Sequence, residues 1–299
     1  MNDTPSGQAN GLLFALAAYF IWGVLPLYLH LIDHVPPFEF VGWRILFTLP
    51  VCIALIAWRK QVTQLRAALG NPRVLKLLTA SSLLIGANWL IYTAAIQSGH
   101  FFAASLGYYI NPLVNVLAGT AFLGEKLTRR QWIAVGIAAI AVSLLAWDAR
   151  EMLWISLSLA FSFAGYGLVR KFAPVAPLPG LTIEAVILVL PALAIVAFFA
   201  QTPAGMSVGQ DAATNWLVAC SGVITATPLL LFATAAQRMS YSALGFVQYE
   251  APTLVFLIGL FVFDEALRPV QLACFLLIWA AIAIYSWDIW SRRNREAAA

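Results

Sequence analysis

Long apolar runs occupy most of the chain and restrict the folds that are open to it. Crossing a bilayer as a helix takes about 20 apolar residues. Ten segments meet this length, namely residues 11–31, 38–58, 74–97, 100–122, 130–147, 152–170, 181–200, 214–236, 241–262 and 269–289. They lack the ten-residue alternation that is typical of barrel strands. The sequence therefore predicts an all-α integral membrane protein with ten transmembrane helices.

The composition excludes several other classes of protein. Of the 299 residues, 62% are hydrophobic and 10% are charged, whereas soluble domains carry about 25% charged residues. The net charge of +4 is spread over the loops and does not form a nucleic-acid footprint. Cys52, Cys220 and Cys274 stand singly in apolar runs, so we expect small buried side chains and neither a metal site nor a cofactor.

The positions of Lys and Arg set the expected orientation. The chain has 17 Lys and Arg residues. If the N-terminus is cytoplasmic, Arg150 and Arg268 lie on the outer side of the membrane, Arg44 lies within a span, and the other fourteen lie on the inner side. The positive-inside rule then makes residues 1–10 and 290–299 cytoplasmic tails of a protein in a bacterial-type inner (plasma) membrane. Glu184, near the start of the 181–200 segment, is predicted to be an interfacial charge on the inner side.

One pattern occurs twice in the chain. An offset of 140 residues matches five features of 105–148 with features of 243–288, namely Pro112 with Pro252, Gly119 with Gly259, Glu125 with Glu265, Gln131 with Gln271, and Trp147-Asp148 with Trp287-Asp288. We predict one five-helix repeat over 11–147 and a second over 152–289. Because five is odd, the second repeat runs inverted. Inverted repeats of this kind hold substrate at their interface near the bilayer midplane.

Glu250 is the sharpest polar signal in these segments. It lies about nine residues into the 241–262 segment, roughly 13 Å deep at 1.5 Å per residue. A charge there costs several kcal/mol unless it is paired, hydrated or protonated. We predict a substrate-binding and proton-coupling carboxylate. The alternative is a protonated or Arg-paired Glu that only orders the bundle.

Arg44 is the second charge placed inside a predicted span. It lies about 10 Å from Pro37 along the helix. Glu39 is five residues away, about 140° around the helix, and is a poor partner. We predict that Arg44 faces the cavity and binds a substrate carboxylate or pairs across helices, for instance with Glu250. The alternative is an Arg whose stem reaches outward to the interface.

Prolines inside the predicted helices are candidate hinges of alternating access. Pro112 and Pro252 stand about half-way along matching helices. Pro26 lies in the first predicted helix and has no matching proline in the second repeat. Each removes a backbone hydrogen bond and frees a carbonyl. The nearby Asn111, Asn115 and Gln248 are assigned to substrate binding, with satisfaction of the freed backbone groups as the alternative. Glu125 and Glu265 are predicted to cap or pair with the next helix start.

Aromatic residues form two groups. Seven tryptophans fit the interfacial belt of membrane proteins, namely Trp58, Trp132, Trp147, Trp154, Trp216, Trp287 and Trp290. A second group lies well inside the spans or beside polar residues, namely Trp22, Trp89, Tyr92, Tyr108, Tyr109, Tyr166 and Tyr249. Of these we assign Trp22, Tyr92, Tyr108, Tyr166 and Tyr249, together with Asn88, to an amphipathic substrate pocket. Core packing is the competing interpretation for each aromatic.

Several stretches resemble the EamA branch of the drug/metabolite transporter superfamily, and its RarD group in detail. They are FIWGVLPLY (20–28), EFVGWR (39–44), NWLIY (88–92), SLGYYINPLVNV (105–116) and QYEAPT (248–253). The resemblance implies ten helices in two inverted repeats and the movement of small organic molecules. Two positions depart from the family pattern, because Glu250 stands where an apolar residue is usual and Trp43 where His is frequent.

We therefore expect a secondary transporter that exports a small organic solute, such as an amino acid, a metabolite or a drug-like compound. It would work by alternating access around a midplane cavity. No GxxxxGK[ST] motif occurs, so the energy would come from a gradient, with a proton as the candidate coupling ion. A passive facilitator or channel is the alternative, and an intramembrane enzyme is disfavoured because neither HExxH nor GxSxG is present. The other expected partner is membrane lipid, and monomer and homodimer are equally compatible with the sequence.

Overall fold

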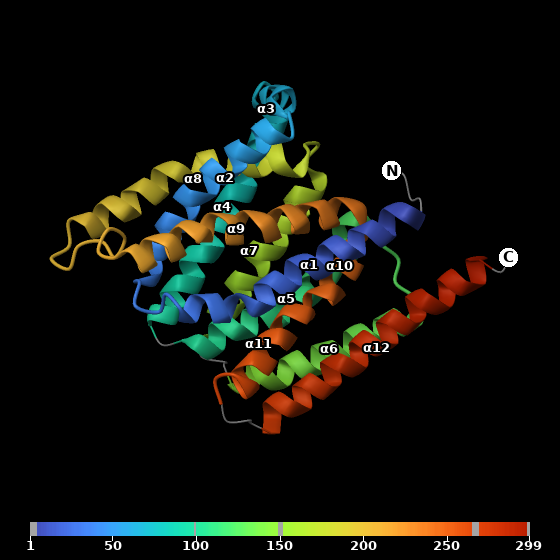
Figure 1. Cartoon of the computed structure of the whole chain (residues 1–299). Coiled ribbons are helices and arrows are strands. Elements are labelled where there is room, and N and C mark those ends of the chain that lie inside the picture. Colours follow the sequence, from blue (N-terminus) through green and yellow to red (C-terminus); the bar gives the residue numbers. More distant parts are fainter. Residues whose placement is uncertain (1–4, 99, 149–151, 265–268, 298–299) are drawn as a thin grey trace.

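All regular secondary structure of the described residues is helical (Figure 1). The computed structural model describes residues 5–98, 100–148, 152–264 and 269–297. These residues form α1 (Pro5–His30), α2 (Pro37–Trp58), α3 (Val62–Leu69), α4 (Pro72–Gln97), α5 (Phe101–Leu123), α6 (Arg129–Asp148), α7 (Leu153–Phe172), α8 (Pro177–Ala200), α9 (Ala212–Arg238), α10 (Tyr241–Gln248), α11 (Glu250–Phe261) and α12 (Pro269–Ala297). Arg150, Glu265 and Arg268, which entered the charge and repeat arguments, lie outside the described residues.

The ten predicted spans are confirmed. Ten helices of the described residues are long and apolar enough to cross a membrane, with α10 and α11 together forming the span Tyr241–Phe261. Two features differ from the prediction. A short helix, α3, follows the second span, and the ninth span is divided at Tyr249. Both chain ends and α3 lie toward one end of the bundle (Figure 1), as an even number of crossings requires.

Local chemistry fixes the helix starts. The Asn71 side chain accepts hydrogen bonds from the Arg73 and Val74 N–H groups at the start of α4. Helix α8 begins at Pro177, four residues before the predicted start, because proline is tolerated in a first helical turn. Asp211 caps α9 by accepting from the Thr214 N–H at 2.8 Å. This backbone hydrogen bond lowers the pKa of the exposed Asp211 carboxyl.

The helix packing follows the pattern of two inverted halves. Matching the halves in chain order pairs α1 with α7, α2 with α8, α4 with α9, α5 with α10–α11, and α6 with α12. The contacts α1·α9 and α4·α7 then exchange with each other, as do α1·α11 and α5·α7. The contacts α2·α8, α5·α10 and α6·α12 map onto themselves and so fall on the pseudo-two-fold axis. The arrangement is consistent with the predicted inverted repeats.

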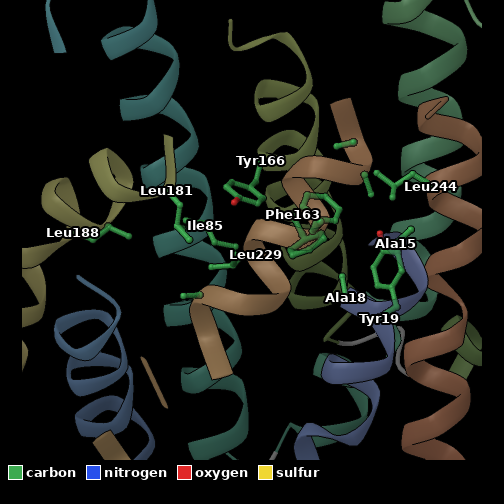
Figure 2. Close-up of a cluster of buried hydrophobic side chains, with 14 of the residues drawn as sticks. Ala15, Ala18, Tyr19, Ile85, Phe163, Tyr166, Leu181, Leu188, Leu229 and Leu244 are labelled. Atoms are coloured by element: carbon green, nitrogen blue, oxygen red, sulfur yellow. The ribbon is translucent and has the colours of Figure 1, made fainter. Parts of the chain in front are cut away.

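The largest buried cluster lies among α1, α2, α4, α5, α7, α8, α9 and α10. Figure 2 shows part of it, including Tyr19 of α1, Phe163 and Tyr166 of α7, and Leu229 of α9. The Tyr166 ring stacks on Phe232 with centroids 5.9 Å apart, and Phe163 lies 5.3 Å from the same ring. The ring centroids of Tyr19 and Phe232 lie 6.3 Å apart and those of Trp22 and Phe163 lie 5.6 Å apart, so aromatic contacts also join the first half of the chain to the second.

The outer surface of the bundle matches the predicted belt. All seven belt tryptophans are exposed, from 47% for Trp132 to 74% for Trp216. Cys52 and Cys274 are buried, as predicted. The prediction for Cys220 was wrong, because its side chain is exposed. An apolar run alone does not indicate which face of its helix meets lipid.

Candidate functional site

Arg44 lies in the second helix with an aromatic ring over its guanidinium group. Its Cζ lies 4.5 Å from the centroid of the Trp89 ring and 5.8 Å from that of Phe40. Its Nε donates to the Thr225 hydroxyl at 3.2 Å. Trp89 and Thr225 come from α4 and α9, which are equivalent helices of the two halves. Contacts from both halves thus fix this cation at the repeat interface.

Tyrosine side chains complete what we call the Arg44 cluster, namely Arg44, Trp89, Tyr92, Tyr108 and Tyr28 with Phe40 and Thr225. Tyr92 and Tyr108 meet edge to face with centroids 5.8 Å apart. Tyr28, Tyr92 and Tyr108 all lie close enough to Arg44 to interact with its charge. Tyr108 is 41% exposed although it lies mid-span in sequence. The structure thus brings three predicted site residues, Arg44, Tyr92 and Tyr108, into one cluster.

Arg44 has no carboxylate partner among the described residues. Their ion pairs are His30–Asp33, His34–Asp33 and Arg170–Glu184. Neither suggested partner, Glu39 or Glu250, contacts Arg44 in this way. Glu39 is fully buried and accepts from the Ser207 N–H at 2.8 Å, the Ser207 hydroxyl at 2.9 Å and the Trp43 indole at 3.2 Å. Its acceptors are thus occupied by neutral donors.

Glu250 is half-buried at the start of α11, next to the break at Tyr249. Its Oε2 is buried and has no hydrogen-bond partner within the described part of the chain. Tyr19 of α1 lies close enough for an electrostatic interaction with this carboxylate, and the Tyr19 hydroxyl also has no partner there. Glu250 therefore faces α1 and is separate from the Arg44 cluster.

A polar crossing joins α5 and α10. The Asn115 amide donates to the Gln248 side-chain oxygen at 2.8 Å, and both residues are buried. Gly245 allows this close approach, because a Cβ at that position would lie 2.8 Å from the Pro112 carbonyl oxygen. Asn111 is also buried, and its Oδ1 lacks a partner among the described residues.

The three candidate hinges differ in their surroundings. Pro112 lies within the continuous α5 and Pro26 within the continuous α1. Pro252 lies three residues after Tyr249, where the ninth span is divided. Tyr249 itself is buried in the apolar cluster of α5, α6 and α12, and its hydroxyl has no partner among the described residues. Tyr249 keeps helical backbone angles, with φ −62° and ψ −14°, so the division is a local interruption of the helical hydrogen bonds just before Pro252, in the second half of the chain.

Three other predicted site residues lie within the packed interior. Trp22 packs on Tyr19, Phe163 and Phe232 with centroid distances of 5.6 to 5.8 Å. Tyr166 is 1% exposed and belongs to the same cluster. The Asn88 amide donates to the Leu159 carbonyl and the Ser162 hydroxyl, both at 2.9 Å, and ties α4 to α7. The structure does not bring these residues into the Arg44 cluster.

A buried ion pair lies nearer the end of the bundle that holds α3. Arg170 and Glu184 are 0% and 2% exposed and approach to 3.5 Å. The Ser81 hydroxyl donates to Glu184, and Arg170 Nη2 donates to the Pro177 carbonyl at 3.0 Å. The prediction of an interfacial Glu184 was wrong. Because α8 begins at Pro177, Glu184 lies two turns inside the helix and is enclosed by α4 and α7.

Glu125 caps a helix, but not the expected one. Its two carboxylate oxygens accept from the Tyr241 N–H at 2.6 Å and the Ser242 N–H at 2.8 Å. These groups open α10, in the other half of the chain, whereas the prediction was the next helix, α6. The predicted type of interaction is thus correct and the predicted partner is wrong. The effect is to fix the α5–α6 turn against the first turn of α10.

Chemically, the arrangement suits binding more than bond-breaking. The described residues contain no group of three or more His, Cys, Asp or Glu side chains that could hold a metal ion. The Arg44 cluster offers one cation, ring faces and tyrosine hydroxyls from the first half of the chain, and the Thr225 hydroxyl from the second half. Tyr28 and Thr225 were missed as site residues because they lie on other helices, α1 and α9. Phe40 was missed although it lies four residues before Arg44 on α2, a spacing that places two side chains on one helix face.

Known proteins resemble this chain over nearly its whole length. Residues 9–147 match the model of the EamA-like transporter family. Protein RarD of Salmonella typhi is 42% identical over 288 residues, covering 96% of this chain and 98% of that protein. An uncharacterized transporter of Pseudomonas aeruginosa is 40% identical over 286 residues, covering 96% of each chain.

A solved crystal structure shares the fold. It superposes with a TM-score of 0.73 at 20% sequence identity and covers 93% of this chain and 97% of its own. Protein RarD of Escherichia coli K12 is 40% identical over 287 residues, or 95% of this chain and 97% of that protein. Identity at this level over the full length, together with ten membrane-spanning helices, means that the chain belongs to the RarD group of the EamA family of membrane transporters.

Proposed function

We propose that this protein is a secondary carrier that binds a small organic solute at the Arg44 cluster. The observation that carries the proposal is a cation inside the membrane without a carboxylate partner among the described residues. Ionisable residues at this depth are costly and mark substrate or ion pathways. An anionic group on the solute would supply the missing charge.

The surroundings of Arg44 favour a solute with a carboxylate and an aromatic or other flat apolar group. A guanidinium binds a carboxylate through two parallel hydrogen bonds. Ring faces of Trp89, Tyr92 and Tyr108 favour stacking with a second ring. Aromatic amino acids and related metabolites have both features, which agrees with the solute class expected from the sequence.

In alternating access, the two ends of the bundle would open in turn, so that one end is closed while the other is open. On the inner side, the Arg170–Glu184 pair and Ser81 join α7 and α8 to α4, and thus join the two halves. The break at Tyr249 with Pro252, and the equivalent Pro112, supply the points of bending. Opening inward would then require separation of the buried pair.

Energy and direction complete the proposal. Glu250 is the candidate proton site, because its Oε2 has no protein partner among the described residues and Tyr19 lies nearby. We infer export across a bacterial inner membrane with both termini cytoplasmic, in keeping with the positive-inside bias. A passive facilitator would share the Arg44 cluster and would not respond to a proton gradient.

Flux from proteoliposomes tests the site. We expect Arg44→Gln to lower transport of an aromatic amino acid by about 10- to 100-fold, the value of a lost charge-assisted hydrogen bond, and Arg44→Lys to retain part of it. Arg238→Gln is the matched control, since Arg238 also stacks on a ring, 5.0 Å from that of Phe14, outside the cluster. Equal effects of Arg44→Gln and Arg238→Gln would contradict the proposal. It would also be contradicted if Arg44→Gln lowered flux of the decarboxylated amine as much as flux of the amino acid itself.

A further inference from the structure

A hollow opens between α4 and α7 at the end of the bundle that holds α3. It has a volume of about 550 Å³ and is lined by Arg73, Lys76, Leu77 and Phe172. Arg73 and Lys76 are exposed and three residues apart on α4, so they lie on one face of the helix. Phe172 ends α7 and is 52% exposed. Two cations and two apolar side chains therefore share one small concave surface.

The positive charge of this hollow is not balanced by acidic residues nearby in the sequence. The sequence contains no Asp or Glu between Glu39 and Glu125, whereas Arg59, Lys60, Arg66, Arg73 and Lys76 all fall there. Within the described residues, neither Arg73 nor Lys76 forms an ion pair. Both lie in the first two turns of α4, where the positive end of the helix dipole disfavours cations. An anion placed between them would relieve both repulsions.

The apolar half of the hollow narrows the class of anion. A free inorganic anion would leave Leu77 and Phe172 unused, whereas a ligand with an apolar tail would cover them. Helix α3 lies at the same end and packs through Ala68 on Val74 and Leu78 of α4. Its Leu69 remains 50% exposed, as expected for a helix at the level of lipid headgroups.

We propose that this hollow binds one anionic phospholipid of the inner leaflet. The phosphate would contact Arg73 and Lys76, and an acyl chain would run along Leu77 and Phe172. Basic pockets between transmembrane helices on the cytoplasmic side bind anionic headgroups in this manner. The site is separate from the Arg44 cluster and does not depend on which solute is transported.

The test measures phosphatidylglycerol retained by the purified full-length protein in native mass spectrometry, against phosphatidylcholine with the same acyl chains. We expect Arg73→Gln/Lys76→Gln to weaken phosphatidylglycerol binding by about tenfold or more. Arg129→Gln/Arg130→Gln is the matched control, because it removes two exposed cations from the start of α6, on the same side of the membrane as the hollow. It should bind as the wild type does. Unchanged elution in size exclusion shows that each variant is folded.

Two further arms identify the ligand. Phe172→Ala should weaken retention of phosphatidylglycerol, and excess inorganic phosphate should fail to displace the lipid. Displacement by phosphate, together with an unchanged Phe172→Ala variant, would overturn the lipid assignment and indicate a simple anion site. Equal losses in the two double variants would also overturn it, since attraction to the basic surface as a whole would then explain the binding.

Discussion

The Arg170–Glu184 pair should keep the inner end of the bundle closed, and removal of one partner should open it. Both side chains are buried, at 0% and 2% exposure, so Glu184→Gln leaves a guanidinium without a counter-charge. Breaking a buried pair in this way costs about 3–5 kcal/mol. If the cost falls on the closed state, an opening equilibrium at this end shifts by about 100-fold or more at 1.4 kcal/mol per factor of ten.

Cys52 provides a natural reporter for that opening. Its side chain is fully buried and lies beside Thr182 and Glu184. In a Cys220→Ser/Cys274→Ser background, it is the only thiol left in the sequence. We expect a water-soluble maleimide to label Cys52 slowly in the parent and about 100-fold faster in Glu184→Gln, provided that opening limits the reaction.

Two comparisons separate a lock from a general loss of packing. Replacing both partners, as in Arg170→Met/Glu184→Leu, should return labelling close to the parent rate, because no charge is left unpaired. Gly180→Ala should act like the loss of Arg170, since a Cβ there would overlap the guanidinium, whereas Gly136→Ala meets nothing within 4 Å and is the control. A parent-like rate of Cys52 labelling in Glu184→Gln would refute the idea that the ion pair keeps this end closed. Equal labelling rates in Glu184→Gln and Arg170→Met/Glu184→Leu would refute it as well.

Three other predictions follow from individual side chains. Glu250→Gln should flatten the pH dependence of flux while solute binding persists; an unchanged rate and pH profile would exclude its coupling role. Glu125→Gln should lower apparent stability by about 1–3 kcal/mol, the value of hydrogen bonds to a charged acceptor at the start of α10, as measured by thermal unfolding in detergent. Asp211 has a lowered pKa in the folded chain, so its cap stabilises α9 above the ordinary Asp pKa and is lost as pH falls through the folded value. Hydrogen exchange at the Thr214 amide should then accelerate, beyond the intrinsic pH effect, in the parent at low pH and not in Asp211→Ala.

The sequence was sufficient for the membrane architecture because each span is encoded locally. Length and apolarity mark a helix that crosses a bilayer without reference to its neighbours. Tryptophan placement was also predictable, since all seven belt residues are exposed. Helix α3 carried a weaker signal. Val62, Leu65 and Ala68 follow a helical spacing with the polar Thr63, Gln64 and Arg66 between them, but eight residues are too few for a distinct apolar run.

The candidate site was predictable only in part, because its contacts join helices that are distant in sequence. Arg44 was recognised as an intramembrane charge, but Thr225 is 181 residues away and nothing local connects the two. Glu184 was misplaced by a four-residue error in the start of α8. Proline usually favours a helix boundary, but Pro177 and Pro179 occupy the first turn of α8, where proline is tolerated.

The ionisable groups inside the bundle separate into two kinds, and this separation bears directly on function. Glu39 receives three hydrogen bonds from Ser207 and Trp43, and Arg170 and Glu184 neutralise each other. The protein thus supplies hydrogen bonds to Glu39 and a counter-charge to both Arg170 and Glu184, although Arg170 Nε and Nη1 and Glu184 Oε2 have no hydrogen-bond partner among the described residues. The natural role of these groups is to hold elements together.

Arg44 and Glu250 belong to the second kind. Among the described residues, Arg44 has a hydroxyl and ring faces for partners, and Glu250 leaves a buried oxygen without any. A charge in a membrane must find its counterpart in protein, water, a proton or a ligand. The described residues do not provide that counterpart, so both sites can bind a proton or a ligand reversibly. An anionic solute at Arg44 and a proton at Glu250 would each satisfy this requirement, and a carrier is the class of protein in which both must be reversible.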